Sequence, residues 1–174
     1  RDYLYISIRE AEDLVNDANA NSQLTSVIVA PGSLVGKRLG QTTTSLGMIK
    51  KIINGFPMLK GGVSYTSLHR VTAGIILAVE KGKIGETYLL GGENMPMKNF
   101  AVYVRSILKE KFPDAPQPKI SAFTIPKPIA NILGKMNLVI NQQQAVLGNA
   151  FHYIESTKAK NELGYQHSID DLRS

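Results

Sequence analysis

The most informative part of this sequence is the stretch Gly82-Lys-Ile-Gly-Glu-Thr-Tyr-Leu-Leu-Gly-Gly-Glu-Asn94. Its centre, Glu86 to Leu90, is short and apolar, and two glycines end it, as expected of a buried strand. The strongly apolar segment Val71 to Glu80 precedes it, and Gly82 is placed to close a helix there. The sequence therefore predicts a helix that leads directly into a buried strand.

The same alternation of helix and strand occurs upstream. Tyr3 to about Asn19 reads as a helix, because apolar residues recur at helical spacing. Thr25 to Ala30 reads as a buried parallel strand that Pro31 and Gly32 stop. A helix over Leu46 to Asn54 and a brief extended segment over Val63 to Leu68 follow. This order predicts an α/β protein, with the second half of a parallel sheet in this region.

The character of the sequence changes after Glu93-Asn94, which reads as a turn leading into a helix over Met97 to Lys111. A proline-rich link (113–118), an extended segment (119–125), helical material (128–151) and a last helix, Ser156 to Leu163, follow. We therefore expect two units. Residues 1–92 would form the sheet domain, with an insert at about 37–66 toward the second unit, and residues 93–174 a smaller, mainly helical lobe.

Composition excludes several classes of function. The chain has 174 residues, no cysteine and three histidines that are not spaced as metal ligands, so we expect no metal site. The net charge of +6 is scattered without a recognition motif, which argues against nucleic acid. The apolar runs are too short for a membrane span, and no leader opens the chain, which begins at Arg1. We expect a soluble protein of the cytoplasm or an organelle matrix.

The order and spacing of these pieces resemble the C-terminal half of an extended short-chain dehydrogenase/reductase. This group includes nucleotide-sugar epimerases, dehydratases and dihydroflavonol reductases. The matching pieces are Val27-Ile28-Val29 with Pro31 and Gly36, the helix from Val71-Thr-Ala-Gly74, Gly85-Glu86, Tyr88, Gly91-Gly92-Glu93-Asn94, Thr157-Lys158-Ala159 and Glu162-Leu163-Gly164-Tyr165. The resemblance covers nearly the whole chain and is closest to the sugar-epimerase-like and dihydroflavonol-reductase-like branch.

The resemblance implies the C-terminal part of a Rossmann-type parallel sheet with a smaller α/β substrate lobe. It also implies NAD or NADP as cofactor, a small-molecule substrate of the nucleotide-sugar or ketone/alcohol type, and a homodimer or larger assembly as an option. The family's dinucleotide fingerprint, a glycine-rich turn after the first strand, is absent from this sequence. We therefore expect the chain to be a fragment that lacks a binding site for the pyrophosphate of the dinucleotide.

The helix that carries the family's chemistry departs from its pattern. In the family a Tyr acts as acid or base, and a Lys four residues later lowers the Tyr pKa and binds the nicotinamide ribose. Aligning Ser7, Ala11 and Glu12 with the family's Ser and Ala-Glu pair places Leu4 at the Tyr position and Ile8 at the Lys position. A one-residue slip would instead pair Tyr5 with Arg9 at i and i+4, but it gives up those three matches and rotates the pair around the helix.

Two further features lie close to the implied site. Ser67 and Arg70 stand where the family usually has a His and a helix-capping Asp, which suggests relaxed catalytic demand. The loop Pro31, Gly32, Ser33 and Leu34 is the best candidate for cofactor contact, because the family's equivalent lies against the nicotinamide. The same residues would also form an ordinary turn that ends a strand.

Three hypotheses follow from the sequence. The first is a protein that keeps the family fold, with or without nucleotide binding, but is catalytically impaired. The second is an active NAD(P)-dependent oxidoreductase or sugar epimerase that uses Tyr5 and Arg9 or residues outside this chain. The third is a non-catalytic structural subunit of a larger assembly.

Overall fold

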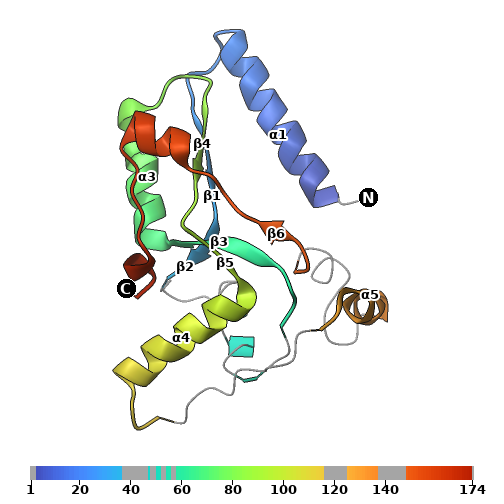
Figure 1. The fold of residues 1–174 in the computed structure, drawn as a ribbon. Helices are drawn as coiled ribbons and strands as arrows, with labels where there is room; N and C mark the ends of the chain where they lie inside the picture. Colours follow the sequence, from blue (N-terminus) through green and yellow to red (C-terminus); the bar gives the residue numbers. More distant parts are fainter. Residues whose placement is uncertain are drawn as a thin grey trace.

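The fold is a mixed α/β arrangement, seen in a computed structural model (Figure 1). The structure describes residues 3–36, 47, 50–51, 54–55, 58–115, 125–136 and 148–173. The elements are α1 (Tyr3–Ala20), β1 (Ile28–Pro31), β2 (Ser33–Val35), β3 (Gly62–Ser67), α3 (Leu68–Lys81), β4 (Thr87–Leu90), β5 (Glu93–Pro96), α4 (Met97–Lys111), α5 (Lys127–Met136), β6 (Phe151–His152), a π-helical turn η1 (Ala159–Leu163) and a 3-10 helix η2 (Ile169–Arg173).

The first sheet is a parallel pair of β1 and β4, and the predicted helix α3 leads into β4. On α3 the buried residues are Val71, Gly74 and Ala78, one stripe at helical spacing. Gly74 allows the close approach, because a Cβ there would lie 2.6 Å from Leu90 Cδ1 and that side chain would have to shift. The predicted helix, strand and parallel pairing are confirmed, and so is the α/β class.

The second sheet has the order β2-β3-β5, with β6 also pairing with β3. β2 and β6 run parallel to β3, and β5 runs antiparallel to it. Tyr65 in β3 stacks on Phe100 of α4, with ring centroids 3.8 Å apart, and fixes that helix against the sheet. The expected boundary at residue 92 stays a prediction, but this sheet crosses it, since β5 and β6 lie beyond that residue.

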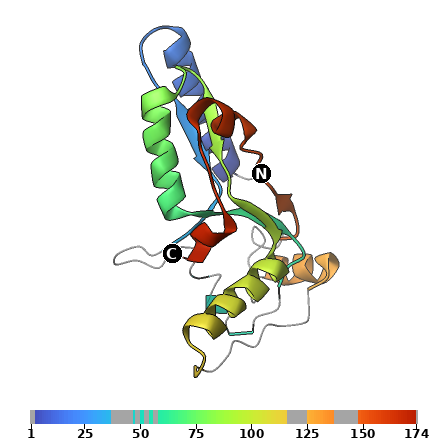
Figure 2. The ribbon, with the colours of Figure 1, turned by 60° about the vertical axis from the view of Figure 1, so that its left-hand side comes forward.

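The C-terminal segment packs back onto both sheets. Ala159, Leu163 and Tyr165 join the core of the first sheet, and Leu172 joins the core around Tyr65. Gly164 ends η1 at φ +75°, a backbone conformation that glycine adopts without strain, and this confirms the predicted stop. In Figure 2 this segment lies across α3 and β4 and returns to the second sheet.

Three sequence expectations are wrong. The first strand is Ile28–Pro31 rather than Thr25–Ala30, because the Asn19 side chain binds the backbone and hydroxyl of Ser26. Glu93-Asn94 is not a turn but the start of β5, which pairs with β3. The helical material predicted to reach Phe151 includes α5, but Phe151 itself is in strand β6. Residues 137–147 between them, most of 46–54, and 116–124 lie outside the described residues.

Candidate functional site

The predicted cofactor loop is where the chain passes from one sheet to the other. Pro31 is still in register with Leu90 in the first sheet, and the Gly32 N–H donates to the Leu90 carbonyl at 3.1 Å. From Ser33 onward the chain pairs with β3. A Cβ at Gly32 would lie 2.6 Å from the Ser64 carbonyl oxygen, so only glycine fits. Pro31 and Gly32 do end the first strand, but the extended chain continues into β2 instead of turning.

The four residues Pro31 to Leu34 consequently have structural roles at the junction of the two sheets. Pro31 is exposed at the end of β1, whereas Gly32, Ser33 and Leu34 are half-buried. The Leu34 side chain packs against the core of the first sheet. Ser33 lies in register with Tyr65 of β3. Cofactor contact by these residues remains a prediction. They lie at the junction between β1 and β2 rather than in a free turn.

Gly91 and Gly92 leave the first sheet beside that junction, and side chains from distant segments hold their backbone. The Gly91 N–H donates to Ser156 Oγ at 2.7 Å, and the Gly92 N–H donates to Ser64 Oγ at 2.9 Å. The Tyr165 hydroxyl donates to the Gly91 carbonyl at 2.9 Å. All these groups are buried, so each bond removes an otherwise costly unpaired polar group. Sequence reasoning missed Ser64 and Ser156, since nothing near them marks a partner so far along the chain.

Tyr65 supplies a polar atom without a partner in the described part of the chain. Its side chain is completely buried, and its hydroxyl makes no hydrogen bond there. Burial, with a smaller contribution from Tyr153, raises the pKa of this phenol above its ordinary value. Tyr65 is therefore a neutral hydroxyl inside the fold.

The two residues of the alternative dyad both lie on α1. Tyr5 is 51% exposed, and Arg9 forms an ion pair with Asp13 at 3.4 Å. Asp13 lies one turn toward the C-terminus, whereas Tyr5 lies one turn the other way. The pairing of Tyr5 with Arg9 stays a prediction that depends on a rotamer change at an exposed side chain.

Arg70, one of the two departures before α3, has a structural partner. Its Nε lies 2.8 Å from Asp171 Oδ1, and both side chains are partly buried. This ion pair ties η2 to the start of α3. Ser67 precedes the helix but makes no side-chain capping bond. No local pattern indicates the Arg70 contact, because Asp171 is far away in the chain.

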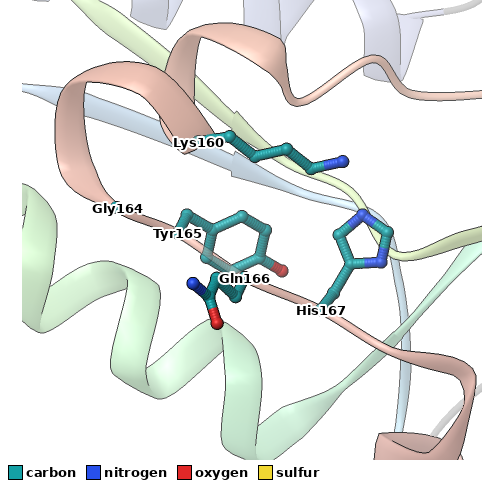
Figure 3. Close-up of a pocket in the computed structure, with 5 residues that line it drawn as sticks. All are labelled: Lys160, Gly164, Tyr165, Gln166 and His167. Carbon is teal, nitrogen blue, oxygen red and sulfur yellow. The ribbon is translucent and has the colours of Figure 1, made fainter.

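Two surface cavities flank β4, one at each end. The cavity of about 370 Å³ near its carboxyl end is lined by Lys160, Gly164, Tyr165, Gln166 and His167 (Figure 3). His167 Nδ1 lies 3.5 Å from Glu93 Oε1. The pKa of the neighbouring Glu155 carboxyl is lowered, first by the Thr157 hydroxyl and then by the charges of Lys160 and His167. Two lining residues, Lys160 and His167, thus lie near the carboxylates of Glu155 and Glu93.

The second cavity, of about 480 Å³, lies between the end of α1 and the start of β4. It is lined by Asn16, Asn19, Ala20, Ile84, Gly85, Glu86, Thr87 and Lys158. Lys158 binds the Glu86 carboxylate and lies 4.9 Å from the centre of the Tyr88 ring. These contacts hold the start of η1 against the sheet. Neither cavity includes Pro31–Leu34, Tyr5 or Arg9.

No group of three or more histidine, aspartate or glutamate side chains is placed to hold a metal ion in the described residues. A dinucleotide also fits only in part. Its pyrophosphate needs a helix N-terminus behind a glycine-rich turn, and α3, which directly follows β3 at Ser67, has none. Helix α3 therefore offers no pyrophosphate site of this kind.

The comparison with solved structures decides the fold family. The protein gox2253 is 26% identical and superposes with a TM-score of 0.70 over 94% of this chain and 51% of its own. A nucleoside-diphosphate-sugar epimerase from Pseudomonas aeruginosa is 24% identical, with a TM-score of 0.69 over 94% of this chain and 50% of its own. This chain has the fold of half an extended short-chain dehydrogenase/reductase.

Another structure with this epimerase-type fold is UDP-glucuronic acid 4-epimerase from Bacillus cereus, solved as a point mutant with a fluorinated UDP-glucuronic acid analogue and NAD. It is 17% identical, with a TM-score of 0.58 over 93% of this chain and 46% of its own. The chain thus spans about half the length of the solved epimerase-fold structures that it matches. No protein-family model and no curated protein sequence matches it.

Proposed function

We propose that this chain is part of an NAD(P)-binding protein of the epimerase/dehydratase type whose catalytic helix is impaired. The observation that carries the proposal is the state of α1: aliphatic residues occupy the Tyr and Lys positions at Leu4 and Ile8, and Arg9 is engaged by Asp13 rather than by Tyr5. Loss of a general acid or base typically costs about 10²–10⁴-fold in rate. The junction at Pro31–Leu34 would contact the nicotinamide end of NAD or NADP.

The comparisons support the family and a nicotinamide cofactor, since one structure of this fold holds NAD together with a nucleotide-sugar analogue. A small-molecule substrate of the nucleotide-sugar or ketone/alcohol type follows from the same likeness. Binding of NADH and NADPH to the intact protein, read from nicotinamide fluorescence, tests the cofactor. Failure to bind either nucleotide would favour a structural subunit over any oxidoreductase.

A double variant tests the impairment directly. Leu4→Tyr with Ile8→Lys restores the family's pair at i and i+4, and we expect its turnover of NAD(P)-linked substrates to rise by about 100-fold or more. Ile6→Tyr with Glu10→Lys puts the same two side chains on another face of α1 and is the matched control. Robust turnover by the parent protein that Tyr5→Phe abolishes would instead establish Tyr5 as the acid and end the proposal of impairment.

A further inference from the structure

A cationic stripe follows the solvent face of α4. Lys98, Val102, Arg105 and Lys109 recur at intervals of four and three residues, and Phe112 continues the line just beyond the helix. Val102 is 54% and Phe112 57% exposed. Within the described residues, Lys98, Arg105 and Lys109 form no ion pair with a carboxylate. The stripe therefore offers positive charge interleaved with apolar surface.

The next helix along the chain, α5, shows the same combination with more apolar surface. Its inner face packs Ala130 and Leu133 into a small core. Its outer face carries Ile129, Ile132 and Met136 in one line, and the last two are 58% and 61% exposed. Lysines at 127 and 135 stand near the two ends, and the helix contains no acidic residue.

Both helices belong to the same end of the molecule. Figures 1 and 2 place α4 and α5 at the end opposite η1, in two views that differ by 60°. Lys83, which pairs with Glu162, and Lys160 lie at the η1 end. In α4 four basic residues stand against one acidic residue, Glu110, and α5 has two lysines and no acidic residue, so the two helices carry an excess of positive charge.

The apolar partners of these cations indicate which ligand they suit. Single-stranded nucleic acid gains most from aromatic side chains on which bases stack, and the exposed residues between the cations are mainly aliphatic. An acidic protein helix could pair with α4 but would leave the outer line of α5 in water. Anionic lipid satisfies both, since its headgroups attract Lys and Arg while aliphatic residues enter the boundary with the acyl chains.

We propose that the α4–α5 end of this protein binds the surface of a membrane rich in anionic lipid. The helices would lie in the headgroup region, since no described helix is long and apolar enough to span a bilayer. This binding is independent of the proposed nucleotide chemistry and would place the lobe at the membrane surface.

Flotation of the intact protein with vesicles tests the proposal. We expect binding at low salt to vesicles of phosphatidylcholine and phosphatidylserine in equal amounts, loss of binding at high salt, and none to phosphatidylcholine alone. Arg105→Gln with Lys109→Gln should weaken binding by about 25-fold, because each cation near an anionic surface contributes about fivefold. Ile132→Ser with Met136→Ser should weaken it as well, since insertion of the apolar line is lost.

The matched control removes the same charge elsewhere: Lys83→Gln with Lys160→Gln should bind vesicles like the parent. Equal weakening by both charge-removing pairs would overturn the proposal, because attraction would then follow net charge alone. No binding to the anionic vesicles at low salt would overturn it too. The proposal would also be overturned if the parent bound polyuridylate RNA but not vesicles, and if Arg105→Gln with Lys109→Gln abolished the RNA binding. All substituted side chains lie at the surface, and circular dichroism of each variant verifies its fold.

Discussion

Gly92 lies where the backbone of one strand passes directly over another, next to Tyr65 of β3. A Cβ at this position would lie 2.0 Å from the Tyr65 carbonyl oxygen, which is backbone and cannot turn aside. We expect Gly92→Ala to lower the free energy of unfolding by about 3 kcal/mol, the upper part of the range for overpacked sites. Urea unfolding measures this. Gly47→Ala is the control, since no atom of the described residues lies within 4 Å of the added methyl, and equal stability of the two variants would contradict the argument.

At Tyr165 the structure predicts how stability depends on alkaline pH. Burial and, to a smaller degree, the Asp171 carboxylate raise the pKa of this phenol from 10.0 to about 12, against the opposing charge of Arg70. The folded chain therefore keeps a proton that the unfolded chain loses. Its contribution to stability is fully present below pH 10 and is lost as the pH rises toward about 12.

Tyr165→Phe should therefore flatten the decline of stability at alkaline pH, by up to about 1.4 kcal/mol per pH unit. Urea unfolding at a series of alkaline pH values measures the slope. Tyr103→Phe removes an exposed hydroxyl that donates to the Ile169 carbonyl, and this variant should keep the slope of the parent. A Tyr165→Phe slope identical to that of the parent would show that this phenol does not control the decline.

Among the described elements, α1 exposes several large apolar side chains. Near its C-terminal end the Asn19 side chain binds Ser26, whereas the apolar side chains of Tyr3, Ile6, Ile8 and Leu14 are exposed. In proteins most of the stability of a helix comes from tertiary packing of its apolar face. A helix with such a face is typical of one that packs against further protein.

Hydrogen exchange of this 174-residue chain tests the position of α1. Amides of α1 should exchange at least about 100-fold faster than those of α3, because few buried contacts oppose local opening of α1. The internal control is α3, which buries Val71, Gly74 and Ala78 against the sheet. Protection of α1 equal to that of α3 would mean that a second copy or another segment covers its apolar face.

Periodic elements could be predicted from the sequence, and contacts between distant residues could not. The limits of α4 and the glycine stops after η1 and α3 follow from local spacing and were predicted. The passage of the chain through Gly32 into a second sheet depends on Ser64 and Thr66, which no local pattern connects to it. For the same reason the Arg70–Asp171 ion pair and the serines that hold Gly91 and Gly92 became visible only in the fold.

For the molecule as a whole, the two sheets share one continuous piece of chain. Residues 28–35 pair first with β4 and then with β3, and the C-terminal segment contributes to the cores on both sides. The sheet domain and the lobe expected from the sequence are therefore joined by backbone pairing as well as by a link. Local sequence patterns show composition changes, such as the one after Asn94, but they do not show which strands cross them.

The pairing of β1 with β4 also affects how this protein folds during its synthesis on the ribosome. Ile28 meets Thr87 and Pro31 meets Leu90, partners about 60 residues apart in the chain. At ordinary rates of synthesis, β4 is made on the order of 3–12 s after β1. During that interval an apolar strand with unpaired edges is exposed, and a nascent chain in this state is prone to aggregation.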